Sequence, residues 1–454
     1  MKRMIDAILE RLQAKKNVVA AVFAMGIKGV GALLTIAIFT LAARAASAEE
    51  FGRLAIWFNA LLLLAIVACF GQDTLIGRSW GEYCGRDDRA MALGAYRYGW
   101  RMLLGSAILF VAGLLVLGPR FDPSLSSTSL SALAAFMFAQ TLLHYSSHSS
   151  RVIVGIAVSE IGRDILWRIV LLIAVAVAVL LHGLSVAEFY FAGAAGMILC
   201  VVIQSIAVRR ALRAAPAVTP RETDRADWSR RGFDMWLSAA VEAASAYADV
   251  MLVGYFAGPA AAGEYFVAAR IANIFLMVQS GLASYGVSRS AHLFFSGQID
   301  RLQDILRSSV AVCVALSAPV LLIILVFGEH ILALFGERYV VAYPTLVMLA
   351  GGAFAMALNG ASSLILLTTG QEKLYSRTVL VATAARMILT AALGAGFGAF
   401  GAACGWALVN APLAVWLARI CRRSSGVDPS ILSVLAPYAG RLRAWLGAAP
   451  VAHS

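Results

Sequence analysis

Long apolar runs recur from one end of the chain to the other, and each is long enough to cross a lipid bilayer. A membrane helix needs about 20 predominantly apolar residues to span about 30 Å of hydrocarbon. The first run, 18–43, is far longer than the core of a signal peptide, so we interpret it as an uncleaved span. The other runs lie at 54–72, 98–118, 129–150, 164–182, 186–208, 234–257, 262–287, 308–327, 343–369, 374–395 and 399–420. We therefore predict an all-α polytopic membrane protein with twelve transmembrane helices.

The composition agrees with a membrane protein and indicates no catalytic or metal centre. Of the 454 residues, 61% are hydrophobic and 14% are charged, against roughly 45–50% and 25% in ordinary soluble domains. The six cysteines are scattered without a CxxC pair, so neither a disulfide framework nor a zinc site is indicated. We expect no catalytic residue, no metal ligand and no cofactor.

The distribution of lysine and arginine predicts the orientation of the chain. Short cytoplasmic loops of membrane proteins accumulate these residues. With both termini inside, the inner segments hold 30 of the 37 cations, and the outer loops hold four. The remaining three lie within spans. We expect both ends of the chain to lie in the cytoplasm, and the net charge of +12 then reflects the inner leaflet and not a nucleic-acid partner.

One polar stretch divides the chain into two halves of six spans each. Residues 209–233 include two prolines and seven arginines and are interpreted as a cytoplasmic linker. The halves are an N-lobe at 18–208 and a C-lobe at 234–423, and an even number of spans gives both the same orientation. The flanking segments, 1–17 and 424–454, are predicted to be amphipathic and to lie on the cytoplasmic membrane surface.

Ionisable residues inside the spans are the candidate functional groups. A charge near the bilayer centre costs at least about 2.5 kcal/mol, so it normally faces a protein interior or a watery cavity. Lys28, Arg270 and Arg386 lie near the middle of three different spans, each beside hydroxyls, glycine or an amide such as Asn273. Cations beside short polar groups suit a diphosphate with an attached sugar, so these four residues are the predicted substrate-binding set.

Two acidic residues on the seventh span form a second candidate group. Glu242 and Asp249 share one helical face, where they could couple transport to a proton or sodium gradient. They could equally serve as structural partners, since buried charges are usually paired. Glu242 is then a partner for Arg270, and Asp249 is a partner for Lys28 or Arg386. Pairing and ligand binding both remain open for Arg270.

Other motifs carry less information about function. His144 and His148 have the spacing of metal ligands, but two ligands do not make a site, and a polar cavity wall is the preferred interpretation. The glycines at 396, 398 and 401 match a dinucleotide fingerprint only formally, because no strand precedes them. The chain has no GxxxxGK[ST] motif, so ATP does not power it directly.

Several short motifs resemble the polysaccharide branch of the multidrug/oligosaccharidyl-lipid/polysaccharide exporter superfamily, which includes the Wzx-type O-antigen flippases. They are Glu50-Phe51-Gly52, Asp249-x-x-Leu252-x-Gly254, Gly263-x-Tyr265-x-x-Ala268-x-Arg270, Phe335-Gly336-x-x-Tyr339-x-x-Ala342 and Gly370-x-x-Lys373. The resemblance implies two six-helix lobes around a central cavity. It also implies alternating-access transport of a polyprenyl-diphosphate-linked oligosaccharide from the cytoplasmic to the outer leaflet, for O-antigen, exopolysaccharide or other polysaccharide assembly.

Alternatives from other classes stay beside this expectation. A multidrug or cation antiporter of the same superfamily has twelve spans, but its cavity should be dominated by acidic and aromatic groups. A lipid II flippase typically has fourteen spans. A membrane glycosyltransferase or polymerase should carry a larger outer loop than any here. The expected partners are the lipid-linked oligosaccharide, membrane lipids, a polysaccharide polymerase and glycosyltransferases.

Overall fold

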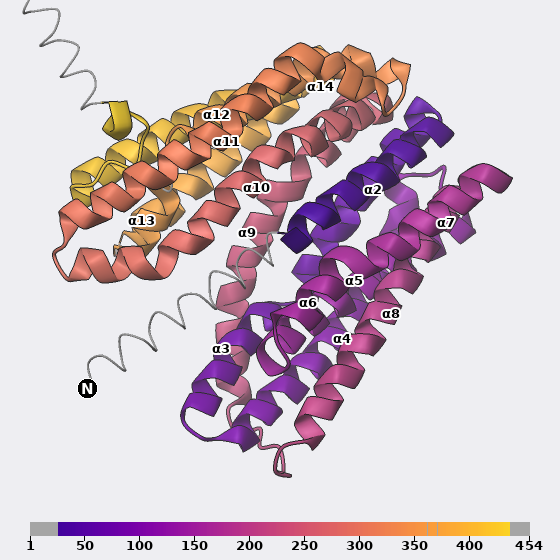
Figure 1. Cartoon of the computed structure of the whole chain (residues 1–454). Coiled ribbons are helices and arrows are strands. Elements are labelled where there is room, and N and C mark those ends of the chain that lie inside the picture. The colour runs from indigo at the N-terminus through magenta and orange to yellow at the C-terminus, as the bar shows by residue number, and fades with distance from the viewer. Residues whose placement is uncertain (1–25, 361, 370, 436–454) are drawn as a thin grey trace, which may run out of the picture. The chain divides into compact units, whose positions relative to one another are not determined.

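The computed structural model describes residues 26–360, 362–369 and 371–435, and every regular element in them is helical (Figure 1). The predicted N-terminal amphipathic segment, 1–17, lies outside the described residues, as do the start of the first span and most of the tail. The chain divides into two compact units, and the sequence boundary between their described parts lies between Gly263 and Glu264. We call them the N-unit, described over 26–263, and the C-unit, described over 264–435, and treat each by itself.

The N-unit consists of long helices joined by short turns. In chain order they are the helix Gly26–Ala45, then α2 (Ala48–Ala68), α3 (Gln72–Gly85), α4 (Arg89–Phe121), α5 (Ser127–Ile153), α6 (Ile156–Ile161), the π-helix η1 (Gly162–Leu166), α7 (Trp167–Leu181), α8 (Val186–Arg213) and α9 (Arg225–Ala257).

Polar caps define several helix starts in the N-unit. Ser47 and Glu50 form a capping box at α2, and Ser185 and Glu188 form another at α8. The side chain of Ser126 accepts a hydrogen bond from the backbone N–H of Ser129 at the start of α5. Each cap satisfies backbone N–H groups that have no partner inside the helix, which explains why these helices begin where they do.

Aromatic side chains hold the centre of the N-unit together. Phe39 packs edge-on against Phe58 with ring centroids 4.9 Å apart, and Phe136 packs against Tyr190 at 5.2 Å. The Tyr190 hydroxyl donates a 2.7 Å hydrogen bond to the carbonyl of Leu54. These contacts join the first helix, α2, α5 and α8 and satisfy a buried hydroxyl.

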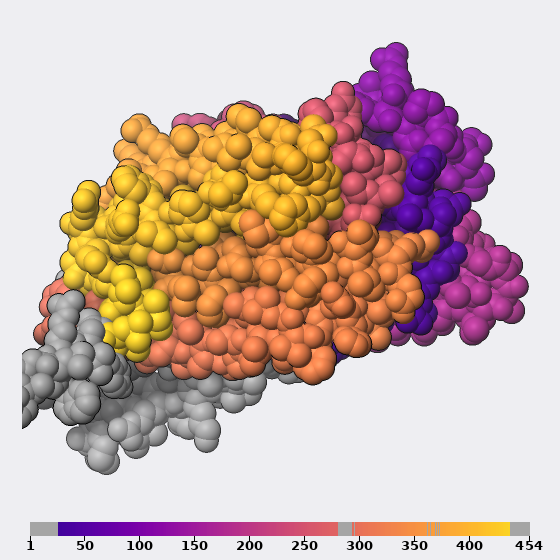
Figure 2. All heavy atoms as spheres, turned by 90° about the horizontal axis from the view of Figure 1, so that it is seen from above, coloured from indigo at the N-terminus to yellow at the C-terminus, as the bar shows by residue number. Residues whose placement is uncertain are grey.

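The C-unit is also entirely helical in its described part. It contains α10 (Pro259–Phe295), which starts in the N-unit, then α11 (Ile299–Ala333), the 3₁₀-helix η2 (Glu337–Ala342), α12 (Tyr343–Ala357), α13 (Ser362–Thr368) and α14 (Glu372–Ser425). Figure 2 shows one face of this unit, built largely from its orange and yellow segments. Large apolar side chains on the surface of the C-unit, such as Leu322, Val326 and Ile388, are more than half exposed, as suits contact with lipid.

The described residues contain ten helices that are long and apolar enough to cross a membrane. The chain is therefore a multi-pass membrane protein, but the predicted count of twelve is not confirmed. The difference falls on two elements. The 27-residue, serine-rich α5 is not among the ten. The 54-residue α14 counts once, although its backbone is non-helical at Phe397 and Gly398, inside the predicted turn between the last two spans.

The structure differs from the sequence prediction at two helix boundaries. The predicted span 343–369 is split into α12 and α13 near Gly360, which has a φ of 59° and whose absent Cβ would lie 2.1 Å from the carbonyl oxygen of Pro429. Tight contact with the segment after α14 therefore interrupts the helix. The predicted linker 209–233 is mostly helical, because α8 continues to Arg213 and α9 begins at Arg225.

The seventh predicted span lies in the N-unit. α9 packs along α2, and it also contacts α3. The boundary between the compact units therefore follows α9, whereas the sequence placed a lobe boundary before it. The division into lobes at 209–233 stays a prediction about the membrane architecture.

Candidate functional site

A sharp chain reversal at the end of α2 positions the first wall of the candidate site. Phe70 and Gly71 both have positive φ, at 51° and 71°. A Cβ on Gly71 would lie 2.1 Å from the carbonyl oxygen of Gly232, so α3 starts in direct contact with α9. The Phe70 ring stacks on Trp236 at 5.0 Å, and the Trp236 indole donates a 2.8 Å hydrogen bond to the carbonyl of Val67.

A pocket of about 360 Å³ lies between α3 and α9, entirely within the N-unit. Its lining residues are Thr74 and Arg78 from α3, and Arg231, Asp234, Met235, Ser238, Ala239 and Glu242 from α9. On α9 the polar members are three or four residues apart, so they form one stripe along the helix. The pocket thus presents guanidinium groups, carboxylates and hydroxyls together.

The two arginines of the pocket differ in their partners. Arg231 pairs with Glu82 at 3.1 Å and with Asp227 at 2.7 Å. Desolvation alone would lower the pKa of Arg231, but these two carboxylates outweigh it and hold the pKa above its ordinary value. Arg78 is exposed, and no acidic group among the described residues lies within 4 Å of it. Arg78 is therefore the better placed of the two to receive an anion.

Three sequence-predicted residues lie in the N-unit, but only one of them lines this pocket. Glu242 is exposed and lines it, one turn beyond Ser238. Asp249 lies two turns further along α9 and is 7% exposed. Lys28, on the first helix, is exposed and is not among the lining residues. The two acids of α9 therefore have different surroundings, although the sequence places them on one helical face.

The other three predicted residues lie in the C-unit. The guanidinium of Arg270 stands 4.5 Å from the centre of the Phe266 ring, a cation–π contact, and Asn273 follows one turn later, partly buried. Arg386 is 5% exposed on α14, and Thr383 and Thr390 are buried one turn to either side. The predicted convergence of all these cations on one substrate stays a prediction.

The sequence analysis missed a polar interior on α5, α6, η1 and α8. Gln204 donates hydrogen bonds to the Ser147 hydroxyl at 3.1 Å and to the Ser159 carbonyl at 3.3 Å. Glu160 is 1% exposed and pairs with Arg163 at 2.8 Å and with Arg151 at 3.6 Å. π-helical turns such as η1 are frequent at functional sites. The available signal was the alternation of acidic and basic residues between 160 and 168, which overlaps the start of the predicted span 164–182.

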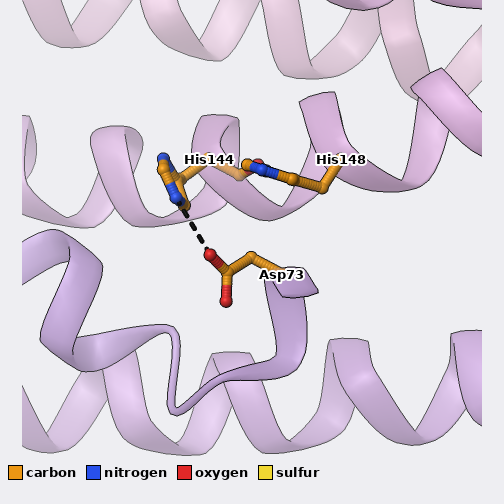
Figure 3. A group of neighbouring side chains, drawn as sticks. All are labelled: Asp73, His144 and His148. Atoms are coloured by element: carbon orange, nitrogen blue, oxygen red, sulfur yellow. Dashed lines mark hydrogen bonds and ion pairs between the residues drawn. The ribbon is translucent and has the colours of Figure 1, made fainter. Parts of the chain in front are cut away.

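A third cluster joins α3 to α5 through Asp73, His144 and His148 (Figure 3). His144 Nε2 lies 3.1 Å from Asp73 Oδ2, and the two imidazole centroids are 4.8 Å apart. Within the described part of the chain, this is the group of at least three histidine, cysteine or acidic side chains that lie close enough together to bind a metal ion. The sequence had offered only the two histidines, because Asp73 is about 70 residues away along the chain.

The sequence model of a family described as polysaccharide biosynthesis protein matches residues 20–288, more than half of the chain. The chain belongs to this family. A second model, MatE, matches residues 235–395. Together they confirm the predicted place of the chain in the polysaccharide branch of the exporter superfamily.

A curated relative, the probable low-salt glycan biosynthesis flippase Agl15 of Haloferax volcanii, is 25% identical over 161 residues, or 35% of this chain. The match spans about a third of that relative, 34% of its length. Among solved structures, an inward-facing multidrug resistance MATE family transporter has a TM-score of 0.71 at 13% identity, with 95% of this chain and 100% of the other covered. The lipid II flippase MurJ has a TM-score of 0.67 at 11% identity, with 94% and 92% covered.

These likenesses confirm the all-α polytopic fold of this polysaccharide biosynthesis family member. A MOP superfamily transporter from Pyrococcus furiosus is similar in the same way, with a TM-score of 0.63 at 15% identity over 91% of this chain and 96% of its own. Agl15 is described as a flippase and the solved neighbours as transporters or a flippase, and at these identities the solved structures show the fold alone.

Several residues of the motifs that carried the family resemblance are packing positions in the structure. The absent Cβ of Gly52 would lie 1.8 Å from the carbonyl oxygen of Pro259, so α2 and the start of α10 touch through backbone. Tyr265, Ala268 and Tyr339 are at most 2% exposed. These motif positions therefore report how the helices pack, whereas Asp249 and Arg270 of the same motifs are candidate site residues.

Proposed function

We propose that this transporter is a flippase for a polyprenyl-diphosphate-linked oligosaccharide, which it moves from the cytoplasmic to the outer leaflet of a bacterial inner membrane. The product would feed the assembly of O-antigen, exopolysaccharide or another polysaccharide. The observation that carries the proposal is the match of the polysaccharide biosynthesis family across nearly all of the N-unit. Agl15, a relative over part of the chain, is described as a glycan biosynthesis flippase, which supports the same substrate class.

The chemistry of the pocket in the N-unit suits the headgroup of such a lipid. A diphosphate needs charge-assisted donors, and a guanidinium can bind phosphate oxygens through two parallel hydrogen bonds. Arg78 offers an exposed guanidinium beside the hydroxyls of Thr74 and Ser238. The carboxylates of Asp234 and Glu242 can accept hydrogen bonds from sugar hydroxyls. The pocket therefore offers donors for the diphosphate and acceptors for the sugar.

The cations inside the spans are proposed to act on the same headgroup at other stages of transport. Arg386 lies in a buried polar environment between two threonines. Arg270 stands over an aromatic ring that favours a planar cation, and Lys28 is exposed on the first helix. Asn273 adds an amide that can bind a hydroxyl. We assign these four residues to substrate binding.

Energy coupling is proposed to involve Glu242 and Asp249. The chain has no nucleotide-binding motif, so the work comes from a proton or sodium gradient or from consumption of the flipped product by polymerase and glycosyltransferase partners. In an ion-coupled cycle, the diphosphate takes an arginine from its carboxylate partner, and the freed carboxylate then binds the ion. Such a cycle requires that each ligand bind the two conformations of the transporter with different affinity.

A cation antiporter is the second candidate, favoured by the acidic groups of α9. Asp234 and Glu242 line the pocket, and Asp249 is buried further along the helix. Carboxylates of this kind suit a cationic substrate, and the multidrug transporter of similar fold is compatible with it. Of the two candidates, the flippase accounts better for the family match and for the buried Arg386.

A reconstituted transport assay separates the two candidates. Purified protein in proteoliposomes is supplied with a polyprenyl-diphosphate oligosaccharide in one leaflet, and a membrane-impermeant, sugar-oxidising reagent measures its arrival in the other. We expect flipping by the wild type and loss of most of it in Arg78→Ala. The matched control is Arg86→Ala, because Arg86 caps the C-terminal end of the same helix, pairs with Glu82 and is outside the pocket. Transport of a cationic dye without any flipping of the glycolipid would refute the proposal.

A further inference from the structure

We propose that Asp73, His144 and His148 form a binding site for a transition-metal ion, with zinc the best match, which ties the start of α3 to α5 inside the N-unit. The proposal does not rest on the transported substrate, because it follows from the side chains alone. One ligand atom from each of the three residues lies within 4.8 Å of the other two. Two imidazoles and one carboxylate are a ligand set that zinc and other first-row metals prefer over sodium or magnesium.

The backbone supplies this geometry from two separate elements. His144 and His148 are four residues apart on α5, so they occupy the same helical face one turn apart. Asp73 is in the first turn of α3, immediately after the reversal at Phe70 and Gly71. Figure 3 shows the carboxylate directed across the gap toward His144, with His148 further along the same helix. The contact of Gly71 with α9 holds α3 at this place.

Hydrogen bonds already present fix one imidazole for metal binding. His148 Nδ1 lies 2.8 Å from the carbonyl oxygen of His144, which can only accept, so Nδ1 carries the proton. In the neutral ring, the lone pair is then on Nε2. A metal-binding histidine commonly donates its other N–H to a backbone carbonyl in this way, which orients the ring.

The contact between Asp73 and His144 has nearly the dimensions of a metal-bridged pair. Ligand atoms that lie about 2.0–2.1 Å from a tetrahedral zinc ion stand about 3.4 Å from each other. Asp73 Oδ2 and His144 Nε2 are 3.1 Å apart in the present arrangement, where Nε2–H donates to the carboxylate. A metal ion on Nε2 would take the place of that proton, and in a neutral ring the proton then moves to Nδ1, so the imidazole stays neutral. The ligand atoms of all three residues already lie within 4.8 Å of one another, so a small adjustment of the side chains would complete the set.

Buried oxygen atoms without hydrogen-bond donors, and the access of solvent to His144, also favour a bound metal ion. Asp73 is 5% exposed, and its Oδ1 accepts no hydrogen bond from the residues that the structure describes. Gln140 lies one turn before His144 on α5, and its buried Oε1 also accepts no hydrogen bond from the described residues. A buried acceptor without a donor is unfavourable, and a cation nearby would offset that cost. The His144 side chain is 19% exposed, so the cluster is not sealed.

Metal binding would have a consequence for the α3–α9 pocket. Thr74 follows Asp73 directly, and Arg78 is one further turn along α3. An ion that ties Asp73 to α5 would therefore also fix the wall of the pocket that carries these two side chains. The site would act as a structural clamp, distinct from the groups that contact substrate.

Zinc binding to the purified full-length chain tests the proposal. The protein carries a purification tag without histidine, is stripped with a chelator, and is titrated with zinc chloride against a fluorescent competitor. We expect one zinc ion per chain and a rise in melting temperature, since a ligand that binds only the folded state stabilises it. Asp73→Asn, His144→Ala and His148→Ala should each weaken zinc binding at least about tenfold. Even the loss of a residue that only hydrogen-bonds to a metal ligand typically weakens metal affinity by about tenfold or more. The control is His182→Ala, because His182 is exposed and pairs with Glu188.

A chemical-protection measurement on the wild type needs no variant to fold. Zinc should protect His144 and His148 from diethyl pyrocarbonate, as read by mass spectrometry, and should leave His182 reactive. The proposal is overturned if the stripped wild type binds no zinc at micromolar concentration. It is also overturned if the variants bind zinc as the wild type does, or if His144 and His148 react equally with and without the ion.

Discussion

Gly71 shows how much of the site depends on a single residue. It has a φ of 71° and lies against the backbone of Gly232, so it needs both a left-handed conformation and the absence of a side chain. This one position sets the start of α3, and α3 carries Asp73, Thr74 and Arg78. A residue with no functional group of its own therefore positions three that have one.

Gly71→Ala should destabilise the N-unit by at least about 2 kcal/mol. The left-handed conformation alone costs roughly 1–2 kcal/mol for a residue with a Cβ, and the contact with Gly232 adds to it. Thermal unfolding in detergent measures the effect. Gly77→Ala is the matched control, because Gly77 is inside the same helix with nothing within 4 Å of its absent Cβ, so the change should stabilise by about 0.5–1 kcal/mol. Equal melting temperatures for the two variants would contradict this reading of the turn.

The cations inside the spans give a second prediction at the residue scale. Arg270→Ala, Lys28→Ala and Arg386→Ala should each reduce export of a lipid-linked glycan, with membrane expression near that of the wild type. Arg270→Lys should restore export only in part, because lysine keeps the charge but loses the planar group that lies over Phe266. Complementation of a flippase-deficient strain is the measurement. Full activity in all three alanine variants would remove these residues from substrate binding.

Among the structural elements, the segment between α8 and α9 depends on ion pairs with α4. Its backbone lies directly on α4, since the absent Cβ of Gly94 would be 1.8 Å from the carbonyl oxygen of Arg221. Glu222 accepts hydrogen bonds from Arg101 on α4 and from Arg225 on α9. Burial alone would raise the pKa of Glu222, but the two arginines outweigh it and hold the pKa below its ordinary value of 4.5.

This depressed pKa predicts that the segment loosens in acid. A carboxylate with a lowered folded-state pKa stabilises the fold above its unfolded pKa, and the contribution is lost as the pH falls through the folded value. Hydrogen exchange of residues 214–224, corrected for the intrinsic rate, should therefore accelerate below pH about 4.5. Glu222→Gln should exchange fast already at pH 7, and Glu188→Gln, in a different turn, should not. Equal exchange at pH 7 in Glu222→Gln and the wild type would show that the pairs do not hold the segment.

At the scale of the whole molecule, the arrangement of charges predicts the topology. Introduced cysteines within 209–233 should react only with reagents that reach the cytoplasm, and cysteines at Gly258 or Pro259 should react from outside. The physical reason is the strong excess of arginine and lysine on the segments assigned to the inner face. Labelling of 209–233 by an impermeant reagent in intact cells would falsify the twelve-span orientation.

Coupling to an ion gradient is the second prediction for the whole transporter. Glycolipid flux in proteoliposomes should respond to an imposed proton or sodium gradient, and Asp249→Asn should lose that response, because the amide cannot bind or release the ion. Ser245→Ala, one turn away on α9, is the control and should keep it. Flux that ignores both gradients, or an Asp249→Asn variant with normal gradient dependence, would leave Asp249 with a structural role only.

The amino-acid sequence by itself determined the class of the protein and most of its helices. A run of about 20 apolar residues is long enough to cross a bilayer as a helix, so the spans can be read directly from the sequence. The distribution of lysine and arginine and the glycines of short motifs, such as Gly52 and Gly263, can also be read from the sequence alone. The same local information placed Glu242 and Asp249 on one helical face. It could not show that Glu242 lines a pocket while Asp249 is buried, because burial depends on the neighbouring helices.

Only the tertiary structure brought together residues that are distant in sequence. Asp73 meets His144 across about 70 residues, and Glu222 meets Arg101 across an even longer interval. A helical pattern repeats every three or four residues and so predicts neighbours on one helix, but it contains no information about which helix lies opposite. The break between α12 and α13 belongs to the same class, since it follows from contact between Gly360 and Pro429. Helices follow from local periodicity, and sites follow from the packing between helices.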